Sequence, residues 1–329
     1  MAQGRTGAAT SQTGIRIGLS AVIIALRDRE AAVLTTHAPD GAPALPFGPF
    51  DPARDRTFEL ALRAFVAAQT GFPLGFVEQL YTFGDLGRDA PRATPGPDQA
   101  REISVGYLAL TADAHEDPSF GAPGFDTTGR DAAWTPIFDV FPWEDWRRGR
   151  PPVVERLGAA LSAWAGDDAA RRGRVESLFA LAPGARWTEE RVLERYELLY
   201  EAGLVAESAR DHGRPVPAPL GDLPMTSDHR RILATGVGRL RSKLKYRPVL
   251  FDLTPETFTL SALQAAAEAV AGLSLHKQNF RRGVERAGLV QPTGVFTSDT
   301  GGRPAELFRH VRPEPGDGRA FGLSLPGQR

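Results

Sequence analysis

The chain has 329 residues, 42% of them hydrophobic and 9% aromatic, which is enough for about two domains with packed cores and excludes wholesale disorder. It contains no cysteine, which excludes a disulfide scaffold, a Cys-ligated zinc site and thiol catalysis and is typical of a reducing compartment. The net charge is only −1, no apolar run approaches the roughly 20 residues of a membrane-spanning helix, and no signal peptide is recognisable, so a cytoplasmic location without membrane contact is expected.

The N-terminal region reads as a flexible arm over residues 1–16 followed by β-structure. Residues Ile15–Leu26 and Ala31–Thr35 are rich in β-branched side chains and predict two strands. Asp28 to Glu30 between them suits a turn, and a Pro- and Gly-containing loop is expected over Pro39–Pro52.

A single helix is expected at the centre of this region, over Thr57–Thr70. Its apolar residues recur at helical spacing, and Gly71 is suited to end it in a left-handed conformation. Further strands are expected at Glu78–Phe83 and Ile103–Leu110. Strands that flank one helix indicate an α/β sandwich.

Residues 115–224 have a different character and are interpreted as a helical insertion or linker. Gly and Pro are scattered through 115–130, and a stretch rich in Trp and Phe follows. Helices are expected at Val153–Trp164 and Thr188–Ala202, the second closed by Gly203.

From residue 225 the pattern predicts helix, helix–turn–helix and hairpin. The helices are expected at Asp228–Leu244, from the cap Thr259 to Ala271, and at Leu275–Ala287; the strands are expected at Leu289–Phe296 and Ala305–Val311. This order is that of a winged helix-turn-helix domain over residues 225–313, followed by a flexible tail over 314–329.

Charge is divided between the two parts of the chain. Residues 225–329 carry 16 Lys and Arg against 9 Asp and Glu, or +7, and the remaining 23 basic and 31 acidic residues give the first part −8. Such a division often means that the basic part faces a polyanion such as nucleic acid. A mildly basic, solvated domain has the same composition, so both readings stay open.

One motif in the first part resembles the Nudix signature. The resemblance is carried by Leu45–Phe50, the helix after it and Gln69–Phe72, and Tyr81–Arg88 and Val105–Leu108 resemble later strands of the Nudix-related transcription regulators. It covers about residues 17–113. It implies a Nudix-type α/β/α sandwich with a mixed sheet, in which residues 17–114 sense an effector.

The signature lacks the glutamates that hold Mg²⁺ in working Nudix enzymes. With Gly71 as anchor, the signature's Arg-Glu pair falls on Ala64 and Phe65, and its Glu-Glu pair falls on Ala68 and Gln69. Counted from Gly48, the upstream glutamate falls on Arg54. The interval between the two glycines is also two residues longer than the signature's, and only Glu59 remains as a carboxylate on the helix. The chain is therefore expected to have no catalytic residue, no metal and no cofactor.

A nucleotide pocket does not depend on those glutamates. Arg27, Arg88 and Arg101 are candidates to bind a diphosphate, and Phe47 or Phe83 is a candidate to stack on a base. Each has a structural alternative, because arginines at strand ends are usually solvated and single aromatic residues usually belong to a core.

The C-terminal part carries the most specific resemblance. Six short segments, in order over about 85 residues, match the winged helix of the Nudix-related transcription regulators, also called NrtR-like regulators. They are Asp228–Ile232, Arg239–Tyr246, Phe258–Leu260, Asn279–Arg282, Thr293–Gly294 and Arg303–Ala305. The resemblance implies that this part binds double-stranded DNA.

The third helix has the pattern of a recognition helix. Phe280, Val284 and Ala287 share one face and are expected in the core, which turns Gln278, Arg281, Arg282 and Glu285 outward. Long side chains that donate hydrogen bonds are what readout of base edges in the major groove requires. The predicted DNA contacts are His276, Lys277, Gln278, Asn279, Arg281 and Arg282 on this helix and Arg303 in the wing.

A second basic cluster, Arg241, Lys243, Lys245 and Arg247, is either a solvated helix face or a further DNA contact. The whole resemblance implies a homodimeric repressor of NAD-metabolism genes whose hold on an operator is weakened by ADP-ribose or a related nucleotide. Two other classes stay open: a divergent nucleotide-diphosphate hydrolase, and an adaptor that binds protein through its winged helix.

Overall fold

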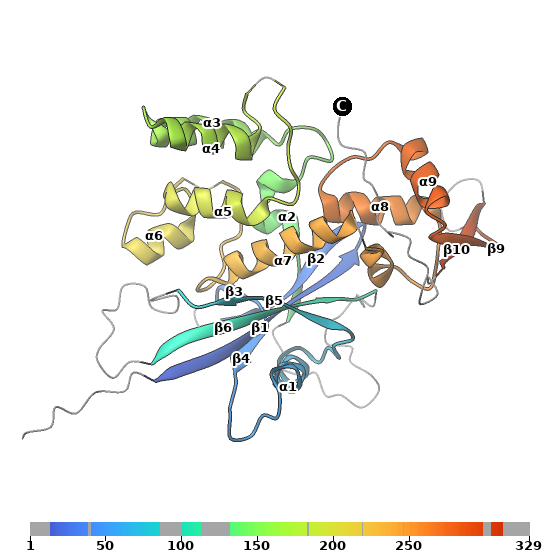
Figure 1. The fold of residues 1–329 in the computed structure, drawn as a ribbon, viewed down its shortest axis with the longest axis horizontal. Coiled ribbons are helices and arrows are strands. Elements are labelled where there is room, and N and C mark those ends of the chain that lie inside the picture. Colours follow the sequence, from blue (N-terminus) through green and yellow to red (C-terminus); the bar gives the residue numbers. More distant parts are fainter. Residues whose placement is uncertain are drawn as a thin grey trace, which may run out of the picture.

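A computed structural model describes residues 14–38, 41–85, 100–112, 132–182, 184–218, 220–245, 247–298 and 304–311. Its centre is a mixed sheet with helices on both faces, and a smaller sheet lies beside it (Figure 1). The first half contains β1 (Ile15–Arg27), β2 (Glu30–His37), β3 (Pro43–Ala44), β4 (Phe47–Pro49), α1 (Phe58–Thr70), β5 (Val77–Phe83), β6 (Arg101–Leu110), β7 (Ala133–Pro136), α2 (Ile137–Val140), η1 (Pro142–Glu144) and α3 (Pro152–Ala165). The second half contains α4 (Ala169–Phe179), α5 (Val192–Glu201), α6 (Ala206–His212), α7 (His229–Leu244), η2 (Val249–Leu253), β8 (Thr257–Phe258), α8 (Leu260–Ala271), α9 (Lys277–Arg286), β9 (Val290–Thr297) and β10 (Ala305–His310).

The large sheet is built on β1. Its strand order is β3-β2-β1-β6-β5, with β4 paired to the first part of β1 and β7 paired to β2. The β1–β6 pair is parallel and the other pairs of this sheet are antiparallel. The β1–β2 hairpin turns through Asp28 and Arg29, whose positive φ angles of 48° and 68° suit a two-residue turn, as the sequence predicted.

Strand β1 is covered on both faces. Leu19, Ala21 and Ile23 belong to a core shared with α1, whereas Val22 and Ile24 belong to a second core shared with α7 and the helices beyond it. Side chains of a strand alternate between faces, so this division follows from the sequence register. The expected α/β/α sandwich with a mixed sheet is confirmed.

Helix α1 has the ends that its sequence predicted. The Thr57 side chain accepts a hydrogen bond from the backbone N–H of Leu60, and Gly71 ends the helix with φ 72°. Ala61, Leu62 and Val66 are buried against the sheet, as expected from their spacing.

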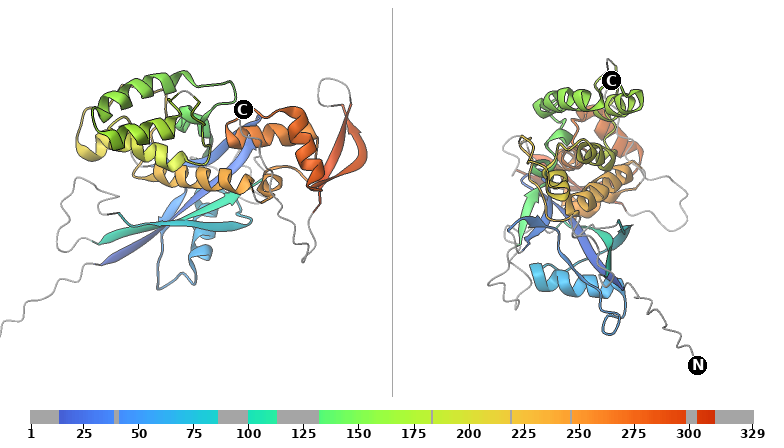
Figure 2. Two further views of the ribbon diagram at one scale, coloured as in Figure 1. Left: turned by 45° about the horizontal axis from the view of Figure 1, so that its top comes forward. Right: turned by 90° about the vertical axis from the view of Figure 1, so that its left-hand side faces the viewer.

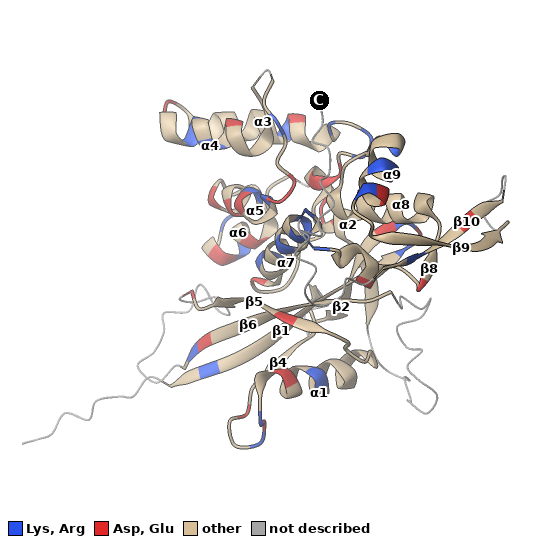
Figure 3. Ribbon diagram, turned by 45° about the vertical axis from the view of Figure 1, so that its right-hand side comes forward, with Lys and Arg blue, Asp and Glu red and all other residues tan. Residues whose placement is uncertain are grey.

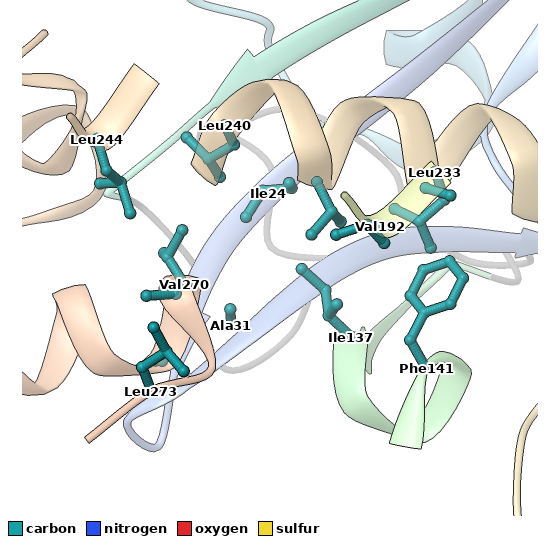
Figure 4. Packing of buried hydrophobic residues seen from close by; sticks show 14 of the residues in the cluster. Ile24, Ala31, Ile137, Phe141, Val192, Leu233, Leu240, Leu244, Val270 and Leu273 are labelled. Atoms are coloured by element: carbon teal, nitrogen blue, oxygen red, sulfur yellow. The ribbon is translucent and has the colours of Figure 1, made fainter. Parts of the chain in front are cut away.

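The opposite helical layer begins with α7, which the sequence assigned to the winged helix. It lies across β1, β5 and β6, and its Leu233 and Leu240 point into the core near Ile24 (Figure 4). Gly236 makes the close approach possible, because a Cβ there would lie 2.9 Å from Cγ1 of Val22. Gly236 therefore serves the packing of α7 on the sheet.

Helices α2 to α6, with η1, stack on α7 and are here called the inserted helices (Figure 2). The two helices that the sequence predicted in this segment are present as α3 and α5, and α5 begins at Val192, four residues later than expected. Strand β7 also falls within residues 115–224, yet it pairs with β2 and extends the central sheet.

The small sheet, of order β8-β10-β9, completes a winged helix with α8 and α9. Thr259 caps α8 as predicted, and Gly272 ends it with φ 69°. Helix α9 begins at Lys277, two residues later than expected, and the N–H of Leu275 before it is bound to the Glu268 carboxylate of α8. Within the described residues no helix is long and apolar enough to span a membrane.

Candidate nucleic-acid interface and effector cavity

Helix α9 lies at one end of the molecule (Figure 1). Phe280 and Val284 are 2% and 0% exposed, so the face predicted to point inward does so, and Ala287 is half-buried. On the other face His276, Lys277, Gln278, Asn279 and Arg282 are exposed. The basic residues of α9 lie on the outside of the molecule, at the edge next to the wing (Figure 3).

Two arginines of α9 differ in how far their side chains are exposed. Arg281 is half-buried and donates to the hydroxyl of Ser261 on α8 at 3.3 Å, so it is attached to the domain. Arg282 is exposed and can reach a base edge. Arg303, the predicted wing contact, lies outside the described residues.

The second basic cluster, for which a solvated face and a DNA contact both stayed open, is divided in the structure: Arg241 and Lys243 are buried, whereas Lys245 and Arg247 are exposed. Arg241 is fully buried and donates to Glu144 at 2.6 Å, Lys243 pairs with Glu78, and Lys245 pairs with Glu190 at 2.8 Å. Burial lowers the pKa of the Arg241 guanidinium, and the nearby charge of Glu144 opposes that change.

Two more arginines of α7 pair in the same way. Arg230 is fully buried between Glu207 and Asp222, and Arg231 contacts Asp85 and Glu197. The acids named here as partners of α7 and of Lys245 all come from the first 224 residues. Part of the charge division seen in the sequence therefore joins the two parts of the chain to each other.

A cavity of about 510 Å³ opens between the sheet and the start of α7. It is lined by Arg16, Ile17, Gly18, Leu19, Ser20, Ala38, Phe47, Gly48, Pro49, Glu102, Ser104, Thr226, Ser227 and His229. The hydroxyls of Ser20 and Ser104 are 3.0 Å apart, and Arg16 lies 3.9 Å from Glu102. The site therefore combines a cation, hydroxyls and an aromatic ring.

His229 and Phe47 stand together at this cavity. Nδ1 of His229 accepts the N–H of Leu45 at 3.0 Å, and the two rings meet edge to face with centroids 4.9 Å apart. Phe47 is 41% exposed, so its ring keeps a free area for a ligand.

Among the predicted effector residues that the structure describes, Phe47 alone lines this cavity. Phe83 is 1% exposed in the core beneath α7, so the prediction that it stacks on a base is wrong. Arg27 lies seven residues along β1 from Ser20, roughly 23 Å away at the rise of a strand, and is likewise no part of the cavity.

Arg101 and Arg88 were also predicted to bind the effector. Arg101 donates to the carbonyl oxygen of Gly84 and is absent from the lining, and Arg88 lies outside the described residues. The cavity also contains four residues that were not predicted: Arg16, Ser20, Ser104 and His229. Serine at a buried position of two paired strands was the available signal, because a buried hydroxyl needs a partner.

The residues that the sequence aligned with the Nudix signature lie on α1 and in the turn before it. Arg54 is in an exposed turn before α1, and Ala64 and Ala68 are exposed on the helix. Phe65 packs on Gly48, where a Cβ would lie 3.0 Å from its ring. Gln69 joins α1 to β4: its amide donates to the Phe47 carbonyl at 2.6 Å and accepts the Phe47 N–H at 3.2 Å.

The carboxylate that α1 carries, Glu59, is already paired. Glu59 forms an ion pair with Arg63 at 2.7 Å. Across the part of the chain that the structure describes, no three His, Asp or Glu side chains are grouped as metal ligands would be.

These elements define a class of protein, a Nudix-type sandwich joined to a winged helix. Residues 250–310, which begin after α7, match the family described as the NrtR DNA-binding winged helix domain. A protein of Acinetobacter baylyi described as "ADPR responsive transcriptional repressor NtrR" is 36% identical over 87 residues, or 26% of this chain. The alignment spans about one third (34%) of that relative.

Solved structures extend the likeness to the whole fold. Shewanella oneidensis NrtR, alone and with a 27mer DNA, matches with a TM-score of 0.52 and 20% identity over 90% of this chain and 94% or 93% of that one. A MutT/nudix family protein of Enterococcus faecalis matches with a TM-score of 0.50 and 14% identity, covering 91% and 88%. The C-terminal domain is thus an NrtR-type winged helix, and the chain has the fold of the Nudix-related, NrtR-like regulators.

Proposed function

We propose that this chain is a DNA-binding transcription repressor that responds to a nucleotide. The observation that carries the proposal is α9, an exposed helix of hydrogen-bond donors in a domain that matches the NrtR winged helix. The Acinetobacter relative is described as a repressor, and Shewanella NrtR was crystallised with DNA.

The effector in this proposal is ADP-ribose or a related nucleotide, bound in the cavity beside β1 and α7. Its volume lies within the roughly 300–1,000 Å³ typical of small-molecule sites. Arg16 would pair with a diphosphate, Phe47 would stack on a base and the two serines suit ribose hydroxyls. The relative is described as responsive to ADPR, and the ligand would weaken DNA binding.

Hydrolysis is not part of the proposed function. The signature positions hold Arg54, Ala64, Phe65, Ala68 and Gln69, and a hard cation needs several carboxylate oxygens. Incubation of the chain with ADP-ribose and Mg²⁺ should release no AMP above background. Turnover would instead favour the divergent hydrolase.

The regulator would act as a homodimer in the cytoplasm. Two winged helices related by a two-fold axis read a pseudo-palindromic operator, which for this class would lie before genes of NAD metabolism. The ligand can weaken DNA binding only if it binds more tightly to a dimer arrangement that does not fit the operator than to the arrangement that does.

A gel-shift experiment with duplexes from the chain's own upstream region and from NAD genes tests the proposal. A shift that weakens steeply with salt and is reduced by ADP-ribose is expected, because phosphate contacts release counterions. A thermal-shift series with NAD, ADP-ribose and nicotinamide mononucleotide identifies the ligand, since a true ligand stabilises the folded chain. A chain that shifts no duplex at any salt concentration would contradict the proposal and favour the protein-binding adaptor.

A further inference from the structure

The inserted helices contact both the effector cavity and the helix-turn-helix. We propose that they transmit occupancy of the cavity to the turn that carries the recognition helix, through contacts at each end of α7. This inference rests on the proposed function, because it describes how the proposed effector would reach DNA binding.

At the cavity end, α6 holds the segment that forms one wall. The N–H of Met225 donates to Glu207 at 2.9 Å. Arg210 donates to the carbonyl oxygens of Met225 at 3.1 Å and Ser227 at 2.6 Å. Thr226 and Ser227 line the cavity, so a ligand there presses on backbone that α6 supports.

This wall is held away from its relaxed conformation. Ser227 has φ 46°, a left-handed conformation that is uncommon for a residue with a Cβ. His229, at the start of α7, lines the same cavity. A ligand that changes the wall therefore acts directly on the first turn of α7.

At the DNA-binding end, the inserted helices hold the turn before α9. Glu144 is fully buried and accepts hydrogen bonds from Arg195 at 2.6 and 2.8 Å and from Arg241 at 2.6 Å. Two residues later, the N–H of Trp146 donates to the carbonyl oxygen of Gly272 at 2.7 Å.

Gly272 permits this approach. Its φ is 69°, and a Cβ there would collide with the carbonyl oxygen of Glu144 and lie 2.8 Å from Nη2 of Arg241. The turn between α8 and α9 is therefore seated on the inserted helices. Its position sets where α9 stands relative to the sheet.

The two ends are connected by α7 itself. Arg230 in its first turn pairs with Glu207 of α6, and Arg241 in its last turn pairs with Glu144. Both pairs are buried, and a buried charge that loses its partner is strongly disfavoured, so these contacts persist when the helix moves. When α7 shifts, α6 and the segment of Glu144 therefore move with it as one rigid body.

Gly272→Ala tests the inference, with Gly288→Ala as its matched control. Gly288 also has a positive φ, 64°, but nothing lies within 4 Å of a Cβ there, so it adds backbone strain without a collision. The measured quantity is the ratio of the Kd for the upstream duplex with and without ADP-ribose, together with the Kd for ADP-ribose alone.

In the wild type the ratio should lie in the range of about 5 to 150 that is typical of coupled sites. In Gly272→Ala it should fall below about 2 while ADP-ribose affinity stays within about twofold, and Gly288→Ala should keep the wild-type ratio. An unchanged ratio in Gly272→Ala would overturn the inference. A wild-type ratio of one would instead refute the proposed function, and the inference with it.

If Gly272→Ala does not fold, Arg210→Ala tests the inference instead. Arg210 is partly exposed, pairs with the neighbouring Asp211 and supports the cavity wall, so its loss should lower the ratio at least about threefold with DNA affinity unchanged in the absence of ADP-ribose. Arg174→Ala, which breaks an exposed pair with Glu201 inside the inserted helices, is its control and should keep the ratio. A wild-type ratio in Arg210→Ala would exclude transmission through this wall.

Discussion

Arg282 stands on the outward face of α9 with its side chain exposed, opposite the buried Phe280 and Val284. Replacing it with alanine should weaken operator binding by about 1–3 kcal/mol, because a bidentate contact to a base edge is lost. The melting temperature should not change. Titration of a labelled duplex measures the effect.

Arg172→Ala is the control for charge. This arginine is exposed on α4, at the other end of the molecule from α9 (Figure 1), and its removal should leave DNA affinity unchanged. Equal losses in the two variants would mean that Arg282 contributes charge alone, and no loss in either would refute the orientation of α9 as the reading helix.

Gln69, which the sequence aligned with a glutamate of the Nudix signature, has a structural role here. Its amide both donates to and accepts from the backbone of Phe47. The double variant Ala68→Glu, Gln69→Glu should hydrolyse no ADP-ribose with Mg²⁺, because the other ligand positions remain without carboxylates. It should also be less stable by about 1–3 kcal/mol, since the new carboxylate faces the Phe47 carbonyl oxygen.

Ala68→Glu alone serves as the control for that stability change. Ala68 is exposed on α1, so the single variant should unfold at the wild-type urea concentration. AMP release by the double variant would show that the signature has been aligned in the wrong register.

At the scale of elements, α7 depends on its glycines. Gly236→Ala should destabilise the fold by about 1–3 kcal/mol, because the new methyl group would lie 2.9 Å from the buried Val22 in β1. Gly173→Ala in α4 has nothing within 4 Å of its Cβ and should stabilise by about 0.5–1 kcal/mol. Urea midpoints compare the two, and a stabilised Gly236→Ala would mean that α7 is not packed this closely on the sheet.

The elements that could be predicted are those with local signals. Thr57 and Gly71 delimit α1, and Thr259 and Gly272 delimit α8, because caps and left-handed glycines are written into the adjacent residues. Strands β3, β4 and β7 are two to four residues long and exist through pairing with β1 or β2. No local pattern of that length distinguishes a strand from a loop.

For helix α7, the sequence predicted that a helix forms but not where the helix lies in the fold. Its periodicity predicted the helix, but its partners are far away in sequence: Arg241 is 97 residues from Glu144, and Lys243 is 165 from Glu78. Sequence alone therefore left its basic residues as a solvated face or a DNA contact. The structure uses them to join the sheet, the inserted helices and the winged helix.

At the scale of the whole molecule, the cavity could be predicted only in part. Phe47 was found because it belongs to the recognised signature. Arg16, Ser104 and His229 come from β1, β6 and α7, and only the parallel pairing of β1 with β6 and the seating of α7 bring them together. The recognition helix, in contrast, is one continuous segment, and its inward and outward faces followed from helical spacing.

The central claim is that occupation of this cavity and DNA binding by α9 are coupled. Coupling between two sites is reciprocal, so DNA must change the affinity for ADP-ribose by the same factor by which ADP-ribose changes the affinity for DNA. Titration calorimetry of ADP-ribose into the free chain and into its complex with the operator duplex measures this directly. The account predicts weaker binding to the complex by at least about fivefold; equal affinity in the two titrations, or no binding in either, would contradict it.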